Sequence, residues 1–383
     1  MRILGIIAEY DPFHRGHERH LQLAREAVQP DFVYVALSGC IRQRGEPALL
    51  SPYDRARCAL AAGADAVFAM PAEWTVRDAE HYALGGVALL KRLGATHLAF
   101  GAETPDPGKL REIAEKLENP PAALRGALKE SLQAGHGYPM ALGLALEREN
   151  GELAEIIRRP NNILAVCYLR AMLRTGGGIQ PVIIPRNGDY HEEGIDPESP
   201  SASALREALR LGSYGPAFGA VTPASREAIR EAFLGGRVPR KDVWDSMLIS
   251  RLREMSREEI RALPDISEGL EDRLKEAAGR IRSREELLEA VSTRRYPKAR
   301  ISRICAAAML GLTRRELDEA PLPERAVLLG LRKNRDMTAM WRSRPEMITT
   351  EWENGTDLRA WKVWAQCAGL PDSLPRTSRV ASL

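Results

Sequence analysis

Two histidines near the N-terminus, His14 and His17, have the spacing needed to act together on a phosphate. They lie in the stretch GIIAEYDPFHRGHERHL, where an apolar run and a Tyr-Asp-Pro turn precede them and Gly16 stands just before the second. A glycine lets the backbone approach a ligand closely, and a histidine can donate hydrogen bonds to phosphoryl oxygens without the bulk of an arginine. The pattern predicts a site that stabilises charge on an α-phosphate as pyrophosphate leaves.

Two other interpretations of these histidines must be weighed. They could simply cap a helix or pack, but H-x-G-H directly after a strand and a Pro-Phe pair favours nucleotide binding. They could also bind zinc, because His20 lies one helical turn beyond His17. Such a pair usually needs an acidic or histidine ligand elsewhere, and the sequence shows no evident third ligand. We therefore predict no metal site built from protein ligands.

The elements that position the histidines alternate regularly over the first hundred residues. Apolar runs typical of buried strands alternate with stretches of helical spacing, which places strands at 2–8, 32–38, 65–70 and 96–101 and helices at 15–28, 52–63 and 79–94. Strands separated by helices of this length form right-handed βαβ units and a parallel sheet with helices on both faces. Ligands of such sheets bind beyond the carboxyl ends of the strands, where the histidine stretch lies.

The pattern changes after residue 101. Residues 106–175 are mostly helical, 179–185 return to a β run that suits a fifth strand of the same sheet, and 199–212 begin a capped helix. From about residue 220 onward the pattern is helical, and the polar tail at 373–383 is expected to fray.

These features predict an α/β fold class with a doubly wound parallel sheet, followed by an all-α C-terminal domain. The catalytic, nucleotide-binding domain is placed at 1–215, with a helical insertion at about 106–175. The helical domain is placed at 220–383.

Composition restricts the remaining possibilities. Hydrophobic residues make up 44% of the 383 residues and charged residues 28%, as in a globular protein, and a net charge of +3 says little about partners. No apolar run is long enough to span a membrane, and the N-terminus has no signal-peptide pattern. The five cysteines are scattered without a C-x-x-C pair, so we expect no disulfide framework and a cytoplasmic location.

Several segments resemble the bacterial tRNA(Met) cytidine acetate ligase family of the HxGH nucleotidyltransferase superfamily. They keep the family's order to about residue 335: EYDPFHRGH, LSGCIRQRGEPALL, FGAE, RPNNILAVCYLRAM, SASALREAL and TRRYPKARISRI. The resemblance implies a nucleotidyltransferase-like Rossmann domain that makes acetyl-adenylate from ATP and acetate. The acetyl group then passes to N4 of the wobble cytidine of elongator tRNA(Met), which gives N4-acetylcytidine. It also implies Mg²⁺ with the ATP, and no membrane or obligate protein partner.

The resemblance assigns His14 and His17 to catalysis and carries over a wider set of ATP contacts. Gly101 would leave room for adenine or ribose, and the Ser-rich helix start with Arg206 would hold the β- and γ-phosphates. The predicted ATP-binding residues are Ile7, Ala8, Glu9, Tyr10, Asp11, Pro12, Phe13, His14, Arg15, Gly16, His17, His20, Gly101, Asn161, Arg186, Ser201, Ser203 and Arg206. Asp11 and Arg15 stand where the family usually has Asn, so the charge of Asp11 needs Mg²⁺ or Arg15 to offset it.

Basic residues in two places are predicted to bind tRNA. Arg42 and Arg44 follow the second strand. They could lie in an ordinary surface loop, but their position at the strand end favours binding of tRNA phosphate or of the triphosphate. The predicted contacts in the helical domain are Arg294, Arg295, Lys298 and Arg300. Tyr296 lies among them and could stack on a base, whereas the tryptophans near the C-terminus are assigned to the core.

Two other functions compete with the ligase. A metabolite nucleotidyltransferase would use the same phosphate site, but such enzymes are typically shorter, and the long helical part of this chain argues against one. A non-catalytic RNA-binding protein could keep a vestigial nucleotide pocket. The intact His14, Gly16 and His17 argue against such decay.

Overall fold

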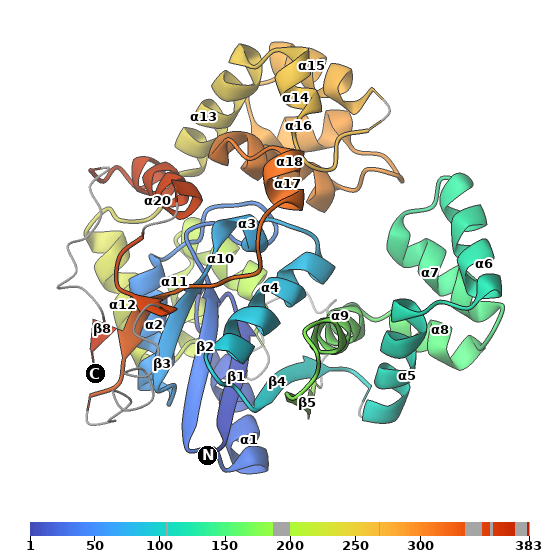
Figure 1. Cartoon of the computed structure of the whole chain (residues 1–383). Coiled ribbons are helices and arrows are strands. Elements are labelled where there is room, and N and C mark those ends of the chain that lie inside the picture. The colour runs from blue at the N-terminus through green and yellow to red at the C-terminus, as the bar shows by residue number, and fades with distance from the viewer. Residues whose placement is uncertain are drawn as a thin grey trace.

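The computed structural model describes residues 1–104, 106–186, 200–267, 269–333, 347–352, 355–371 and 381–382. A mixed sheet with the strand order β5-β4-β1-β2-β3-β6-β7 lies at its centre, and β8 pairs with β6 (Figure 1). The strands are β1 (Ile3–Ala8), β2 (Phe32–Ser38), β3 (Ala66–Met70), β4 (His97–Ala102), β5 (Gln180–Pro185), β6 (Ala326–Leu331), β7 (Ile348–Thr349) and β8 (Ala381–Ser382).

Strands β1 to β5 run parallel to one another and form the predicted doubly wound sheet. Their order changes direction at β1, so the carboxyl end of β1 is the switch point at which such sheets bind ligands. The predicted α/β fold class with a helical C-terminal region is confirmed, and all five predicted strands are present.

The sequence pattern predicted helices throughout the chain after residue 220, but the structure has the strands β6, β7 and β8 there. β6 pairs with β3 in antiparallel orientation, and β7 and β8 add to β6. β6 has the sequence AVLLGL, a short apolar run that periodicity alone cannot distinguish from a piece of helix. Two residues of the tail expected to fray belong to β8, and the tail's residues 372–380 and 383 lie outside the described residues.

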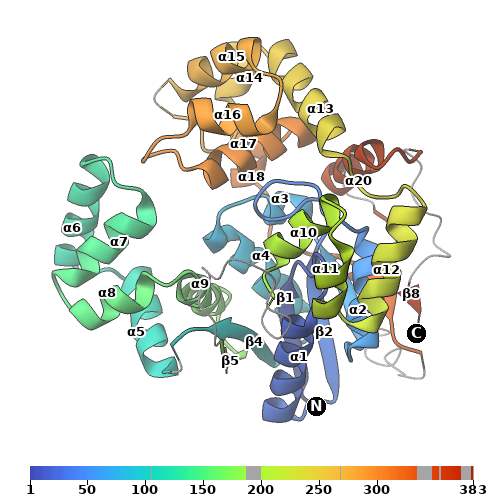
Figure 2. The same ribbon diagram turned by 180° about the vertical axis from the view of Figure 1, so that it is seen from behind.

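Helices cover both faces of the sheet (Figure 2). Successive side chains of each strand point to opposite faces, so each strand contributes to the cores on both sides. Val33, Val35 and Leu37 of β2 face a core shared with one set of helices. This set comprises α1 (Arg15–Val28), α2 (Pro52–Ala61), α10 (Ala202–Arg210), α11 (Tyr214–Ala220) and α12 (Pro223–Leu234). Tyr34 and Ala36 face the opposite core, which contains α4 (Ala79–Arg92) and α9 (Pro160–Arg174).

Helices inserted between β4 and β5 extend from the side of the sheet. They are α5 (Pro107–Glu118), α6 (Ala122–Gln133), α7 (Tyr138–Glu147) and α8 (Gly151–Ile157), and α9 leads back to β5. These helices lie within the range 106–175.

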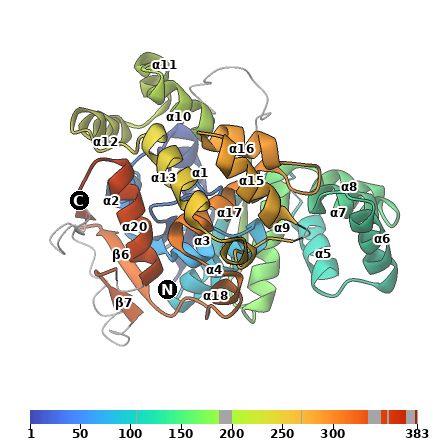
Figure 3. The same cartoon turned by 90° about the horizontal axis from the view of Figure 1, so that it is seen from above.

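The C-terminal helices form a core of their own above the carboxyl edge of the sheet (Figure 3). They are α13 (Lys241–Glu254), α14 (Arg257–Arg261), α15 (Leu270–Arg280), α16 (Arg284–Val291), α17 (Lys298–Leu310), α18 (Arg314–Asp318) and α20 (Gly355–Cys367). Cys40 and Ile41 of the loop after β2, and Ala72 at the start of α3 (Ala72–Thr75), pack into the same core. The helical region is therefore anchored to the edge where ligands are expected.

Candidate active site

His14 and His17 begin helix α1 directly beyond the carboxyl end of β1. The Nδ1 atom of His14 accepts a hydrogen bond from the backbone N–H of His17 at 3.3 Å, and Nδ1 of His17 accepts from the N–H of His14 at 3.4 Å. The two rings stack with their centroids 3.5 Å apart. The histidines therefore cap the helix, which was the alternative to nucleotide binding in the sequence analysis. The same two bonds also fix the orientation of each ring.

This reciprocal cap also fixes which nitrogen of each ring can serve a ligand. Because Nδ1 accepts in both rings, the proton of a neutral ring lies on Nε2, which becomes a donor. Burial, with smaller contributions from Arg186 and Arg206, lowers the pKa of His14 to about 3. Burial and the neighbouring His14 lower the pKa of His17 well below its usual value. The pair thus offers two neutral N–H donors for an incoming anion.

His20 completes a row of three histidines on α1. Burial and then Arg186 lower its pKa to about 4, and its Nε2 is buried with no hydrogen-bond partner among the described residues. No cluster of three or more metal-binding His, Cys, Asp or Glu side chains occurs in the described part of the chain.

The N-termini of α1 and α10 meet beside the histidines. A side chain added at Gly16 would lie 3.2 Å from the ring of His14 and 3.9 Å from Pro200, so only glycine leaves this space open. Ser201 and Ser203 lie at the start of α10 with their hydroxyls 3.2 Å apart, and Arg206 donates to the carbonyl of Asp11 at 2.6 Å. Two helix N-termini and a guanidinium therefore face one place, an arrangement that suits phosphate groups.

A second polar cluster lies at the ends of β4 and β5. Glu103 accepts hydrogen bonds from the backbone N–H groups of Asn161 and Asn162, at 3.1 and 2.9 Å, and so caps helix α9. Asn161 bridges Glu103, 2.6 Å from its amide nitrogen, and Arg186, 3.1 Å from its amide oxygen. Arg186 also passes over Gly101. The asparagine assigned to ATP is therefore the one beside the predicted cation.

Asn162 has the structural role that we expected of one asparagine in this pair. It is fully buried, and its side-chain oxygen accepts from the N–H groups of Glu103 and Thr104 at 3.0 and 3.1 Å. Its amide donates to Thr104 and to the carbonyl of Ile156.

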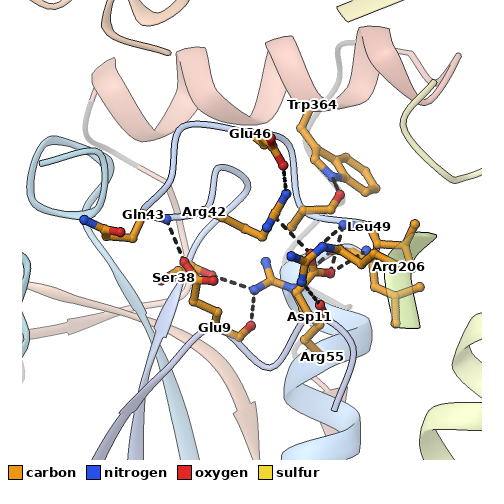
Figure 4. Close-up of polar contacts among 12 residues, drawn as sticks. Glu9, Asp11, Ser38, Arg42, Gln43, Glu46, Leu49, Arg55, Arg206 and Trp364 are labelled. Atoms are coloured by element: carbon orange, nitrogen blue, oxygen red, sulfur yellow. Dashed lines mark hydrogen bonds and ion pairs between the residues drawn. The ribbon is translucent and has the colours of Figure 1, made fainter. Parts of the chain in front are cut away.

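Asp11 does not face the phosphate site with an unbalanced charge. Its carboxylate is buried and accepts hydrogen bonds from the backbone N–H groups of Leu49 and Leu50 at 2.8 and 3.2 Å (Figure 4). Arg42 lies 3.4 Å from the same carboxylate. The sequence suggested Mg²⁺ or Arg15 as the balancing charge; in the structure this role falls to Arg42 and to backbone dipoles.

The comparisons with known proteins agree with this geometry. Residues 1–344 match the model of the HIGH Nucleotidyl Transferase family. The tRNA(Met) cytidine acetate ligase of Acetivibrio thermocellus is 37% identical over 328 residues, which are 83% of this chain and 79% of that protein. The enzyme of the same name from Syntrophomonas wolfei is 36% identical over 83% of this chain and 78% of its own length. The chain belongs to the tRNA(Met) cytidine acetate ligase family.

Solved structures of a more distant relative have the same fold. Thermotoga maritima TmcAL bound with α-thio ATP is 27% identical and has a TM-score of 0.87, covering 96% of this chain and 94% of its own. The apo form of that protein has a TM-score of 0.90 over 96% and 95% of the two chains. The predicted membership of the cytidine acetate ligase family is thus confirmed, and with it an ATP-binding ligase of the nucleotidyltransferase class.

Sequence reasoning missed Arg55, which organises the candidate site of this chain. Arg55 is fully buried and donates to the carbonyls of Glu9 and Ser38 at 2.7 and 2.9 Å, and also to that of Gly39. It therefore ties together the ends of β1 and β2. The signal was a cation on the otherwise small and apolar inner face of α2.

The predicted tRNA contacts fall into two groups. Arg42 is 2% exposed and bonded to Glu46 and Asp11, so the structure does not present it to an RNA ligand. Arg44 in the same loop is exposed. Arg294, Arg295 and Lys298 are also exposed, where the chain enters α17.

Tyr296 is a correction to the sequence analysis, which offered it as a stacking platform for a base. It is 5% exposed, its hydroxyl donates to the carbonyl of Ser267 at 2.9 Å, and Arg300 lies over its ring. It packs in the C-terminal core because the chain turns inward between the exposed basic residues. Trp352, Trp361 and Trp364 are buried as expected, whereas Trp341 lies outside the described residues.

Proposed function

We propose that this protein activates acetate with ATP and transfers the acetyl group to N4 of the wobble cytidine of elongator tRNA(Met). The observation that supports the proposal most strongly is the convergence of the neutral His14–His17 pair with two helix N-termini and the guanidinium of Arg206. Within this family, such a site serves nucleotide chemistry. The relatives' name supplies the acceptor, a cytidine of tRNA(Met).

The first half-reaction takes place at the carboxyl edge of the sheet. An oxygen of acetate attacks the α-phosphorus of ATP, a new P–O bond forms, and the bond to the bridging oxygen breaks as pyrophosphate leaves. The Nε2–H groups of His14 and His17 donate to the phosphoryl oxygens as charge builds there. Ser201, Ser203 and Arg206 hold the β- and γ-phosphates, while Asn161 and Arg186 meet the ribose or the α-phosphate.

The second half-reaction explains why an adenylate is needed. The lone pair on N4 of cytosine is delocalised into the ring, so this amine attacks acetate itself too slowly to be useful. The mixed anhydride carries AMP as a good leaving group, and attack on its carbonyl gives the amide and AMP. Arg44, Arg294, Arg295 and Lys298 are exposed, which supports the proposal that they contact the tRNA backbone during this step.

Mg²⁺ is proposed to enter with ATP, held by phosphate oxygens and water. The described residues offer no group of three metal-binding side chains, and the carboxylate of Asp11 is already engaged by Arg42 and two backbone N–H groups. No step is therefore assigned to a protein-bound ion. A cytoplasmic location is proposed from the tRNA substrate and from the five buried free cysteines. None of the described helices could span a membrane.

The experiment that tests the proposal is release of AMP from ATP, measured with and without acetate and with and without tRNA(Met) transcript. We expect acetate-dependent AMP release, increased by the transcript, and N4-acetylcytidine in the digested RNA. Transfer of the nucleotide to a metabolite, with no acetate dependence, would favour the metabolite nucleotidyltransferase instead. RNA binding without any turnover of ATP would favour a non-catalytic RNA-binding protein.

A further inference from the structure

A polar pocket of about 360 Å³ lies between the sheet domain and the C-terminal helices. Its walls come from the α3–α4 connection on one side and from α17, α18 and the chain before α15 on the other. Four arginines line it: Arg77, Arg300, Arg303 and Arg314. Positive charges withdrawn from water are costly unless each has a partner.

Three of the four guanidiniums are bonded to the protein itself. Arg77, Arg300 and Arg314 each donate to a backbone carbonyl, at Leu317, Asp265 and Ile266 respectively. These bonds join the loop before α15 to α17 and to α18, and join α18 to the α3–α4 connection. The three arginines therefore build the pocket wall as well as charging it.

Arg303 differs from the other three. Among the described residues it makes no hydrogen bond or ion pair, and its Nε, like that of Arg300, is buried without a partner. Burial lowers the pKa of its guanidinium; the more distant carboxylates Asp265 and Asp78 oppose this shift, and Arg300 and Arg44 add to it. Buried donors without partners are rare in folded proteins and often mark the place of a missing ligand.

The acidic residues of the pocket do not neutralise Arg303 by contact. Asp78 is hydrogen-bonded to His81 at 2.9 Å, and Asp318 lies 3.8 Å from Arg77. Asp265 lies 4.0 Å from Arg300. Each carboxylate thus has a closer partner, and the positive charge of Arg303 remains for an anion from outside the protein.

The pocket is joined to the nucleotide site by a short chain of hydrogen bonds. The backbone N–H of Gln43 donates to Glu9, at the end of β1, at 2.7 Å. The side-chain amide of Gln43 donates to the carbonyl of Arg77, in the pocket wall, at 2.7 Å. On the other side of the same loop, the hydroxyl of Ser302 donates to the carbonyl of Arg44. A ligand in the pocket therefore lies beside the loop that borders the ATP site.

We infer that this pocket binds a phosphodiester of the tRNA, close to the cytidine being acetylated, with Arg303 as the principal cation. A guanidinium with unused N–H groups matches phosphate oxygens, and one monoanion balances the one unpartnered positive charge. The inference rests on the proposed function, because it takes the anion from the RNA substrate.

The test compares Arg303→Gln with the wild-type chain, using a tRNA(Met) transcript in filter binding across a salt series. Arg315→Gln is the matched control, since Arg315 lies in the same region on α18, is largely exposed and pairs with Glu319. Arg303→Gln should weaken binding on the order of tenfold and reduce the salt slope by about one, whereas the control should change neither. Arg303→Lys should recover part of the affinity.

Two further measurements separate the sources of the anion and the causes of a loss. Acetyl-adenylate formation without RNA, and thermal unfolding, should be unchanged in Arg303→Gln because no residue in the described part of the chain bonds to this side chain. Loss of adenylate formation would instead assign the pocket to ATP. A higher thermal unfolding temperature of the wild type with inorganic phosphate alone would assign it to a small anion. Unchanged tRNA affinity and slope would overturn the inference. If the wild type fails to acetylate tRNA, the proposed function is wrong, and this result is distinct from an unchanged tRNA affinity in Arg303→Gln.

Discussion

The arginines at the carboxyl edge of the sheet are bonded to the protein, whereas Arg303 on α17 is not bonded to any part of the chain that the structure describes, although Arg300 and Arg314 beside it are. Arg42, Arg55 and Arg206 are bonded to carboxylates or backbone carbonyls close to where ATP is proposed to bind. Around α17, Arg295 is exposed and Arg303 makes no bond among the described residues. The first group shapes loops around a site whose proposed direct donors are neutral histidines. Arg303 is proposed to bind a phosphodiester of the tRNA.

The largest expected effect of this difference is on stability, and Arg55 tests it. Arg55→Met keeps the length of the side chain but leaves the carbonyls of Glu9, Ser38 and Gly39 without their buried donor. The free energy of unfolding, measured with urea, should fall by at least about 3 kcal/mol. Arg57→Met, two residues along α2, removes only half-exposed ion pairs with Glu231 and Asp54 and should cost at most about 1 kcal/mol. Equal losses in the two variants would show that Arg55 does not organise the edge.

Gly45 tests how the two regions are joined. It has φ +76°, and a Cβ there would lie 2.4 Å from the carbonyl oxygen of Ser302 in α17. Gly311 has a similar φ of +63° but open space around it. Gly311→Ala should lower unfolding free energy by about 1–2 kcal/mol from backbone strain alone. Gly45→Ala should lose about 1–3 kcal/mol more, because the loop and α17 must separate. Similar losses would mean that the contact is adaptable.

The neutral state of the histidine pair makes stability depend on pH. The pKa of His14 is about 3 in the folded chain and about 6.5 when unfolded, so acid protonates the unfolded state first. The stabilisation is complete above pH 6.5 and is lost as the pH falls toward 3. His14→Asn keeps an N-cap acceptor without this titration. Between pH 7 and 5 its unfolding free energy should fall by about 2 kcal/mol less than that of the wild type. Parallel pH profiles would contradict a neutral His14.

The smallest expected effect is on the exposed charges around α17. The Arg295→Glu, Lys298→Glu double variant should weaken tRNA binding on the order of tenfold and reduce the salt slope by about two, with ATP affinity unchanged. Arg230→Glu on α12 reverses a similarly exposed charge outside this region and serves as the control. An unaltered slope in the double variant would mean that these side chains are only a solvated surface.

The sequence predicted the part of the fold that local patterns encode. The five parallel strands were predictable because each is a short apolar run bracketed by a helix with recognisable caps, as at Ser51 and Asp78. The histidine pair was predictable because its partners lie within one helical turn. β6 was not, because its assignment depends on pairing with β3, about 260 residues earlier in the chain.

Side-chain direction was the second limit. Arg42 looked like a surface cation, because nothing near it in sequence shows that Asp11 helps to hold it inside the protein. Tyr296 looked like a base platform among basic residues, yet a bond to Ser267 draws it into the core. The roles of these residues depend on long-range contacts, which periodicity and composition do not contain.

The most direct test of the central claim is acetyl-adenylate formation by His17→Ala in the absence of tRNA. Loss of one neutral donor aimed at the α-phosphate should slow this half-reaction on the order of a hundredfold or more. Affinity for the tRNA(Met) transcript should remain that of the wild type, and the chain should still fold, with an unfolding temperature lowered by the loss of the reciprocal cap. Wild-type rates of acetyl-adenylate formation in a fully folded His17→Ala chain would contradict the account.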